Sequence, residues 1–256
     1  MKTLSAAPRL EPRDCPHGHG LYQAKVTSIL LDRDCEIASR CPVCAGQVRD
    51  RARQLEERDR QSRIARLMSV SGLPRRFAQA DFNSYVARTK EQRDALRILR
   101  TFTEKFQELE AKGSSLLLIG GPGTGKTHLA LAALRALTER EIPCFYATAA
   151  SMLAGIKDHY GQRGGERLQA AAFDHLHRVR LLIIDELDVG LSEHDIGLLF
   201  RVVDGRYADL MPMVLISNRP LEQLEKSLGQ RLMDRLRDCA VTVAFAWPSY
   251  RGTKGV

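Results

Sequence analysis

The stretch from Gly120 to His128 constrains the fold of this chain more than any other feature of its sequence. It reads GGPGTGKTH and contains the pattern G-x-x-x-x-G-K-[ST]. The apolar run 116–119 before it predicts a buried strand, and the run 129–137 after it predicts a helix. Glycines let such a loop point its backbone N–H groups inward, and the helix directs its positive N-terminal end to the same place. We therefore predict a phosphate-binding loop formed by Gly120, Gly121, Pro122, Gly123, Thr124, Gly125, Lys126, Thr127 and His128.

Two carboxylates follow the apolar strand predicted at 181–185. Because the carboxyl ends of parallel strands meet at one edge of a sheet, Asp185 and Glu186 would lie beside the phosphate loop. We expect Lys126 to reach the β- and γ-phosphates of a nucleotide. Thr127 would ligate magnesium directly, and Asp185 would hold it through water. Glu186 would act as the general base that activates the attacking water.

Three further polar groups are weaker candidates. Asn218 follows the strand predicted at 213–217 and could orient that water, or it could simply begin a turn. Arg231 and Arg235 lie four residues apart and share a helix face. That face could be a solvated basic surface, or it could offer a guanidinium to the γ-phosphate in a neighbouring subunit. Arg251 could contact the nucleotide of its own chain, or it could be an ordinary basic residue of the tail.

The composition is that of a globular soluble protein. The chain has 256 residues, of which 44% are apolar and 27% charged, enough for one sizeable domain and a small module. No apolar run approaches the roughly 20 residues that span a bilayer, and the N-terminus lacks the apolar core of a secretory signal. We therefore expect a cytoplasmic protein. The net charge of +8 permits nucleic-acid binding without establishing it.

Residues 1–45 predict a small cysteine–histidine module, because they have little that could build an apolar core. Cysteines of cytoplasmic proteins seldom form disulfides, and two short ligand pairs separated by a loop are typical of a structural zinc site. The predicted ligands are Cys15, His19, Cys41 and Cys44. His17 could replace His19, and Cys35 could replace either histidine. The stretch 23–31 has the polar–apolar pattern of a ribbon strand, which favours His19; scattered reduced thiols are the alternative to a metal site.

Residues 46–70 predict an exposed connecting helix. The segment has mixed charges, no proline and only a narrow apolar stripe, so it is either solvated or docks along one face on a partner. The sequence SGLP at 71–74 ends this helix and marks the start of the main domain, 71–256.

The main domain alternates predicted strands and helices. The strands are 116–119, 142–148, 181–185, 213–217 and 241–247; the helices are 88–111, 129–137, 151–160, 166–179, 193–207 and 221–238. Continuous apolar strands separated by helices predict an α/β fold with a parallel sheet covered on both faces. Gly197 and Gly205 fall within one of these helices and weaken it.

The order of the motifs GGPGTGKTH, LLIIDE, ISN, LGQRLMDRLR and WPSYR resembles that of the bacterial DnaC-type helicase loaders, which are AAA+ ATPases. The resemblance covers about residues 71–251 and implies an AAA+ domain without the usual helical lid. It also implies that Asn218 is sensor 1, Arg235 the arginine finger and Arg251 sensor 2. Some of these loaders carry an N-terminal zinc module.

The resemblance implies an ATP-dependent loader of a replicative DNA helicase that uses ATP, Mg²⁺ and Zn²⁺. The N-terminal region would hold the helicase, and the ATPase domains would assemble through their ATP sites on single-stranded DNA. The family binds DNA through the helix after the second strand, where this chain has Lys157 and Tyr160. Tyr160 could also be an ordinary aromatic residue at a helix end. The alternative functions are a transposition helper ATPase of the IstB type, a small-molecule kinase and a purely binding adaptor.

Overall fold

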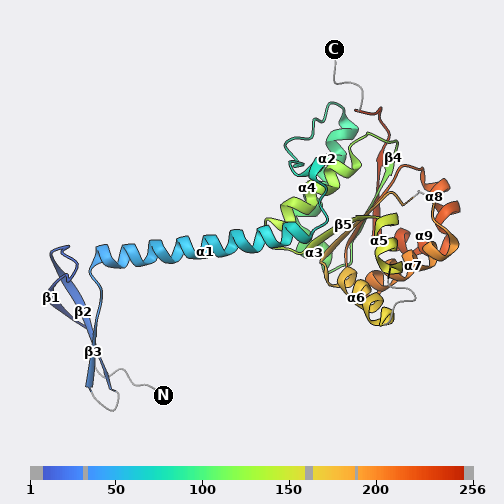
Figure 1. The fold of residues 1–256 in the computed structure, drawn as a ribbon. Coiled ribbons are helices and arrows are strands. Elements are labelled where there is room, and N and C mark those ends of the chain that lie inside the picture. Colours follow the sequence, from blue (N-terminus) through green and yellow to red (C-terminus); the bar gives the residue numbers. More distant parts are fainter. Residues whose placement is uncertain (1–7, 31–33, 159–163, 188–189, 251–256) are drawn as a thin grey trace. The chain divides into compact units, whose positions relative to one another are not determined.

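The structure is a computed structural model that describes residues 8–30, 34–158, 164–187 and 190–250 (Figure 1). The chain divides into two compact units, 1–62 and 63–256, which are described in turn. None of the described helices has an apolar stretch long enough to cross a lipid bilayer.

The N-terminal unit is built on a small antiparallel sheet. Its strands are β1 (Arg9–Asp14), β2 (Leu21–Leu30) and β3 (Asp34–Ala38), with β2 in the middle. The sequence pattern predicts only the middle strand, because the flanking strands are short and rich in charged residues. Among the described residues, the buried apolar side chains of this unit are those of Cys15, Ala24, Val26 and Cys41. A core this small contributes little free energy of folding, which is typical of units stabilised by a metal.

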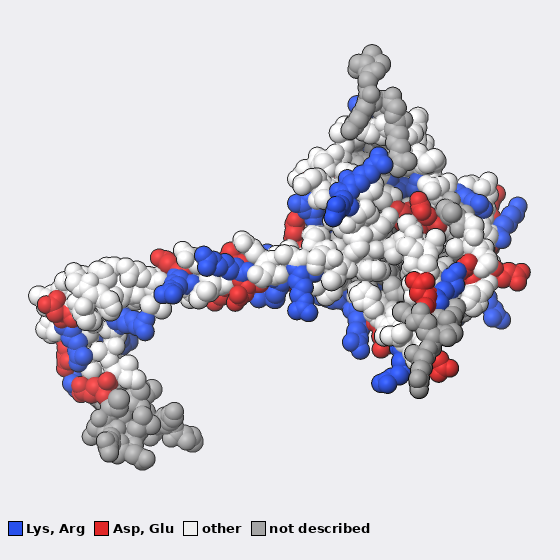
Figure 2. Space-filling view, in the orientation of Figure 1, with Lys and Arg blue, Asp and Glu red and all other residues white. Residues whose placement is uncertain are grey.

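Helix α1 (Pro42–Val70) passes from the first unit into the second. It begins at Pro42 rather than at residue 46 as predicted, since proline fits the first helical position, where no hydrogen bond from its nitrogen is needed. Cys44 therefore lies in the first turn of α1. No residue of α1 is buried, and side chains of both charges line it (Figure 2). The helix ends before Gly72, whose φ of 73° is left-handed, as the predicted break at 71–74 requires.

A five-stranded parallel sheet forms the centre of the second unit (Figure 1). Its order is β5 (Cys144–Thr148), β6 (Leu181–Asp185), β7 (Met213–Ser217), β4 (Ser115–Gly120) and β8 (Ala240–Phe245). Every residue of β6 and β7 is buried, as their continuous apolar sequences predict. The chain thus brings the ends of β4, β6 and β7 to one edge of the sheet.

Helices pack on both faces of this sheet and enclose a hydrophobic core on each. One core is covered by α2 (Lys90–Glu104), α3 (Phe106–Glu110) and α4 (Lys126–Thr138). The other is covered by α5 (Ala149–Lys157), α6 (Gly165–Arg178), α7 (Glu193–Ala208), α8 (Leu221–Leu228) and α9 (Gln230–Cys239). This arrangement confirms the predicted α/β fold with a parallel sheet between helices.

Some predicted bounds are wrong for local reasons. The single helix predicted at 88–111 is two helices, because the backbone of Lys105 leaves the helical region between α2 and α3. Strand β5 begins at Cys144 rather than residue 142, since Pro143 has no N–H to donate to a neighbouring strand. Strand β8 ends at Phe245, and Trp247 turns its indole to the loop after β4 instead.

The two glycines within α7 have different surroundings. A Cβ atom at Gly205 would lie 2.3 Å from Cε1 of His177, so this glycine permits the close packing of α7 against α6. A Cβ atom at Gly197 would meet nothing within 4 Å. The cost in helix stability expected at both positions is therefore offset by packing only at Gly205.

Candidate functional site

The loop between β4 and α4 has the conformation that its glycines were expected to permit. Gly120, Gly123 and Gly125 have φ values of 141°, 76° and 97°, which side chains other than glycine rarely adopt. A Cβ atom at Gly120 would also lie 2.3 Å from the carbonyl oxygen of Phe245. Helix α4 begins at Lys126, so its N-terminal N–H groups belong to the same loop. The loop is built to surround an anion.

Lys126 is held at the centre of this loop. Its side chain is buried, and its ammonium donates to the carbonyl oxygens of Gly120 and Gly121 at 2.7 Å each. A buried ammonium needs such oxygen partners, and phosphate oxygens are equivalent acceptors. The position is the one predicted for a lysine that binds phosphates.

The two predicted magnesium ligands lie together. The Thr127 hydroxyl donates to Asp185 Oδ2 at 2.8 Å, across the edge of the sheet between α4 and β6. A hydroxyl can donate its proton to a carboxylate while its lone pairs face a cation, and hard oxygen ligands suit Mg²⁺. Thr127 and Asp185 therefore fit a magnesium site. Glu186 directly follows, with its N–H donating to Asp185 Oδ1 at 2.8 Å and a left-handed φ of 57°.

A cleft of about 460 Å³ collects most of the predicted side chains. It is lined by the phosphate loop from Pro122 to His128 and by Asp185, Glu186 and Asn218. The topology explains this, because Asn218 follows β7, which lies between β4 and β6. A cleft that joins an anion loop, two carboxylates and an amide can bind a nucleotide and place a water molecule beside its phosphates.

The segment after β8 forms one wall of the cleft and holds the phosphate loop. The indole Nε1 of Trp247 donates to the carbonyl oxygen of Thr124 at 2.9 Å. The backbone N–H of Tyr250 donates to the carbonyl oxygen of Gly123 at 2.9 Å. Both residues belong to the predicted WPSYR motif. The candidate Arg251 is next in sequence but lies outside the described residues.

The segment before α2 forms a second wall of the cleft. The Tyr85 ring lies so close to Gly125 that a Cβ atom there would be 2.6 Å from its Cε2. His128 Nε2 donates to the carbonyl oxygen of Asp81 at 3.0 Å and lies 3.1 Å from the Ser84 hydroxyl. The predicted His128 thus anchors this wall to α4.

Sequence reasoning missed Tyr146 of β5. Its hydroxyl donates to Asp185 Oδ2 at 3.1 Å. Burial, and then the neighbouring charge of Asp185, raise the pKa of Tyr146, so that the hydroxyl keeps its proton. The contact joins neighbouring strands far apart in the chain, and no sequence spacing indicates it.

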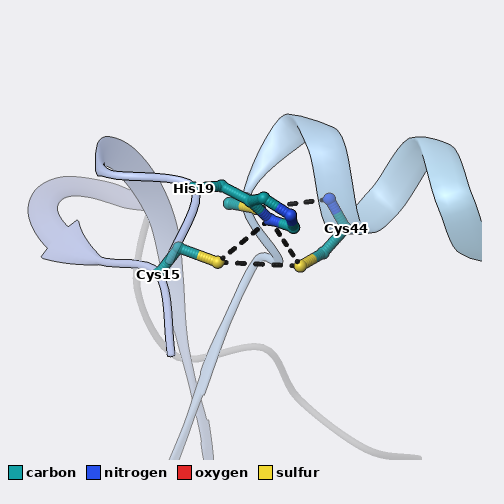
Figure 3. A group of neighbouring side chains, drawn as sticks. Cys15, His19 and Cys44 are labelled. Carbon is teal, nitrogen blue, oxygen red and sulfur yellow. Dashed lines mark hydrogen bonds between the residues drawn. The ribbon is translucent and has the colours of Figure 1, made fainter. Parts of the chain in front are cut away.

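In the N-terminal unit, Cys15, His19, Cys41 and Cys44 form a compact cluster. Figure 3 shows Cys15, His19 and Cys44 of this cluster. His19 Nδ1 lies 3.4, 3.5 and 3.3 Å from the sulfur atoms of Cys15, Cys41 and Cys44, and the sulfurs of Cys15 and Cys44 are 3.6 Å apart. A tetrahedral zinc ion with Zn–S near 2.3 Å and Zn–N near 2.0 Å separates its ligands by roughly 3.5–3.8 Å. The cluster therefore has the dimensions of a metal site.

Of the two alternative ligands, His17 can be compared with His19, whereas Cys35 cannot. His17 Nδ1 lies 3.8 Å from the Cys44 sulfur, whereas His19 contacts all three thiols of the cluster. The side chain of Cys35 lies outside the described part of the chain. His19 is therefore the histidine that completes the set of four ligand atoms within 4.8 Å of one another.

Comparison of the sequence with those of known proteins assigns the chain to a family. A family model described as IstB-like ATP binding protein matches residues 47–254, which include the whole nucleotide cleft. The replicative helicase loader DnaC of Escherichia coli K12 is 31% identical over 203 residues, covering 78% of this chain and 81% of that protein. The chain belongs to the IstB/DnaC-like ATP-binding family.

Solved structures of this group share the fold. The crystal structure of the DnaC helicase loader superimposes with a TM-score of 0.59 at 22% identity, over 67% of this chain and 99% of the other. The crystal structure of DnaI gives a TM-score of 0.60 at 21% identity, over 73% and 100%. The AAA+ fold predicted from the motif order is thereby confirmed.

The predicted arginine finger of the IstB/DnaC-like chain lies outside the cleft. Arg235 of α9 pairs with Asp204 of α7 at 2.8 Å, and its guanidinium lies 5.0 Å from the centre of the Tyr207 ring. With Arg231 it lines a hollow of about 220 Å³. Its side chain is 43% exposed, so it can be offered to another molecule.

Of the two predicted DNA contacts, one is described. The Lys157 ammonium pairs with Asp195 Oδ1 at 2.7 Å, and this contact, followed by hydrogen bonds from Ser192, lowers the pKa of Asp195 to about 2. The charge of Lys157 is thus already matched within the chain. Tyr160 lies outside the described residues.

Proposed function

We propose that this chain is an ATP-dependent loader of a replicative DNA helicase. The observation that carries the proposal is the cleft that unites Lys126, Asp185, Glu186 and Asn218 in a chain 31% identical to a protein named replicative helicase loader. The IstB/DnaC-like family binds ATP, and the lysine, two carboxylates and amide of the cleft are groups of the kind that ATP hydrolysis uses, which supports this proposal.

Each group has a part in the proposed ATPase. Lys126 and the loop N–H groups bind the phosphates. Thr127 and Asp185 would hold magnesium, whose charge would neutralise that of the phosphates. Glu186 accepts a proton from the attacking water, and Asn218 orients that water. We assign Arg235 to the active site of a neighbouring subunit and Arg251 to that of its own chain.

The remaining regions supply the partners in this proposal. The module 1–45, with zinc bound by its four-ligand cluster, and the helix 46–70 hold the helicase, while the domain 71–256 self-assembles and binds single-stranded DNA. Because the Lys157 ammonium is paired with Asp195, we propose that DNA contacts Tyr160 and helix α5 as a whole.

A pull-down with the tagged chain, expressed in its native host, tests the proposal. It should bring down the replicative helicase, and its ATPase activity should depend on Lys126. Recovery of a transposase instead would favour the IstB-type helper, the second candidate, which the name of the matching family model supports. A small-molecule kinase is disfavoured because Glu186 stands next to Asp185, where an attacking water would lie.

A further inference from the structure

Tyr146 is buried beside the proposed magnesium ligand. It lies in β5, the strand next to β6, and is 8% exposed. Its backbone N–H donates to the carbonyl oxygen of Ser71 at 2.8 Å, at the end of α1. A Cβ atom at Gly72 would lie 2.1 Å from the Tyr146 carbonyl oxygen, so the chain after α1 packs directly on this residue. The position of the tyrosine is therefore fixed from outside the phosphate loop.

The carboxylate of Asp185 receives three hydrogen bonds from different parts of the fold. The Glu186 N–H holds Oδ1, while Thr127 and Tyr146 both donate to Oδ2. Thr127 belongs to the loop that must bind nucleotide, and its hydroxyl oxygen is a proposed metal ligand. The Tyr146 hydroxyl is the donor to Oδ2 that comes from the central sheet, apart from the phosphate loop. Because β5 pairs directly with β6, this hydroxyl can orient the carboxylate without contacting the loop itself.

We propose that Tyr146 is a positioning residue for magnesium, whose hydroxyl orients Asp185 toward the water shell of the cation. The inference rests on the proposed ATPase function. Partners that orient a metal ligand change metal affinity strongly even though they do not touch the metal. Tyr146→Phe should therefore leave the nucleotide site intact and weaken only its response to magnesium.

The test is a titration of the full-length chain with a fluorescent ATP analogue, in EDTA and at increasing MgCl₂. For Tyr146→Phe we expect the affinity in EDTA to stay within about twofold of wild type. The MgCl₂ concentration at which half of the magnesium-dependent change in ATP-analogue affinity has occurred should rise about tenfold. Tyr22→Phe is the matched control, because it removes a hydroxyl that donates to the Ser39 carbonyl in the N-terminal sheet. It should leave both quantities unchanged.

If the wild-type chain responds to magnesium and Tyr146→Phe has the same half-effect MgCl₂ concentration, the inference is overturned and the proposed function still stands. An equal loss of affinity with and without magnesium also overturns it, because that is the pattern of a packing defect. A wild-type chain that binds no ATP overturns the proposed function, and this inference with it.

Discussion

At Glu186 the chain leaves β6 in a conformation that few residues other than glycine adopt. Its φ is 57°, and its N–H is bound to the carboxylate of Asp185. Such a backbone costs on the order of 1–3 kcal/mol and is retained where the surroundings impose it, most often at functional sites. This backbone leaves the carboxylate of Glu186 in the cleft beside the phosphate loop, which is where the proposed activation of a water molecule would need it.

Replacing Glu186 by glutamine separates shape from basicity. Glu186→Gln should bind ATP as wild type does and hydrolyse it at least about 10²-fold more slowly, the usual effect of losing a general base. Lys126→Ala should instead weaken binding itself, and the exposed Glu222→Gln should change neither. Binding titrations and single-turnover hydrolysis measure the two steps. Normal hydrolysis by Glu186→Gln would show that Glu186 is not the base.

At the scale of elements, the strands whose bounds the sequence predicts are those with unbroken apolar runs. β6 and β7 are buried on both faces and match the predicted 181–185 and 213–217. β1 and β3 are not predicted, since both are short and β1 consists mainly of charged residues. In the cleft, the motif residues are predictable from spacing, whereas Tyr146 is found only from contacts between strands.

Two Gly→Ala substitutions should have opposite effects on stability. Gly72 has a φ of 73° and its Cβ would meet backbone at 2.1 Å, so Gly72→Ala should destabilise the chain by about 2–3 kcal/mol. Gly197 lies inside α7 with open space around it, so Gly197→Ala should stabilise by about 0.5–1 kcal/mol. Denaturant unfolding measures both, and equal effects of the two would contradict this account.

The metal cluster should be separable from the nucleotide site. Purified protein should carry about one zinc per chain, because a core this small depends on its metal. Cys41→Ser removes a buried ligand and should release the zinc while leaving ATP binding largely intact. Cys239→Ser, which changes a thiol outside the cluster, should retain it. Metal analysis of protein prepared without chelator decides the matter, and absence of zinc in the wild-type chain would refute the site.

At the scale of the whole molecule, Arg235 distinguishes a chain that works alone from one that works in an assembly. It lies on α9, is paired with Asp204 and does not line the cleft of its own chain. If it serves a neighbouring subunit, Arg235→Ala should bind ATP normally and hydrolyse it poorly, even with single-stranded DNA present. Loss of ATP binding in this variant would instead indicate a structural role.

Mixing Arg235→Ala with Glu186→Gln tests this geometry directly. Each variant alone should be inactive, but some mixed interfaces pair an intact Glu186 site with an intact Arg235 from the other variant. Those interfaces should recover part of the ATPase activity, and the recovery should rise and fall with the mixing ratio, provided that subunits exchange. An arginine that acts within its own chain predicts no recovery, because every chain still lacks one essential group. If co-assembly is shown independently and no activity returns, Arg235 is not a trans-acting finger, and Arg231 on the same helix face becomes the candidate to test.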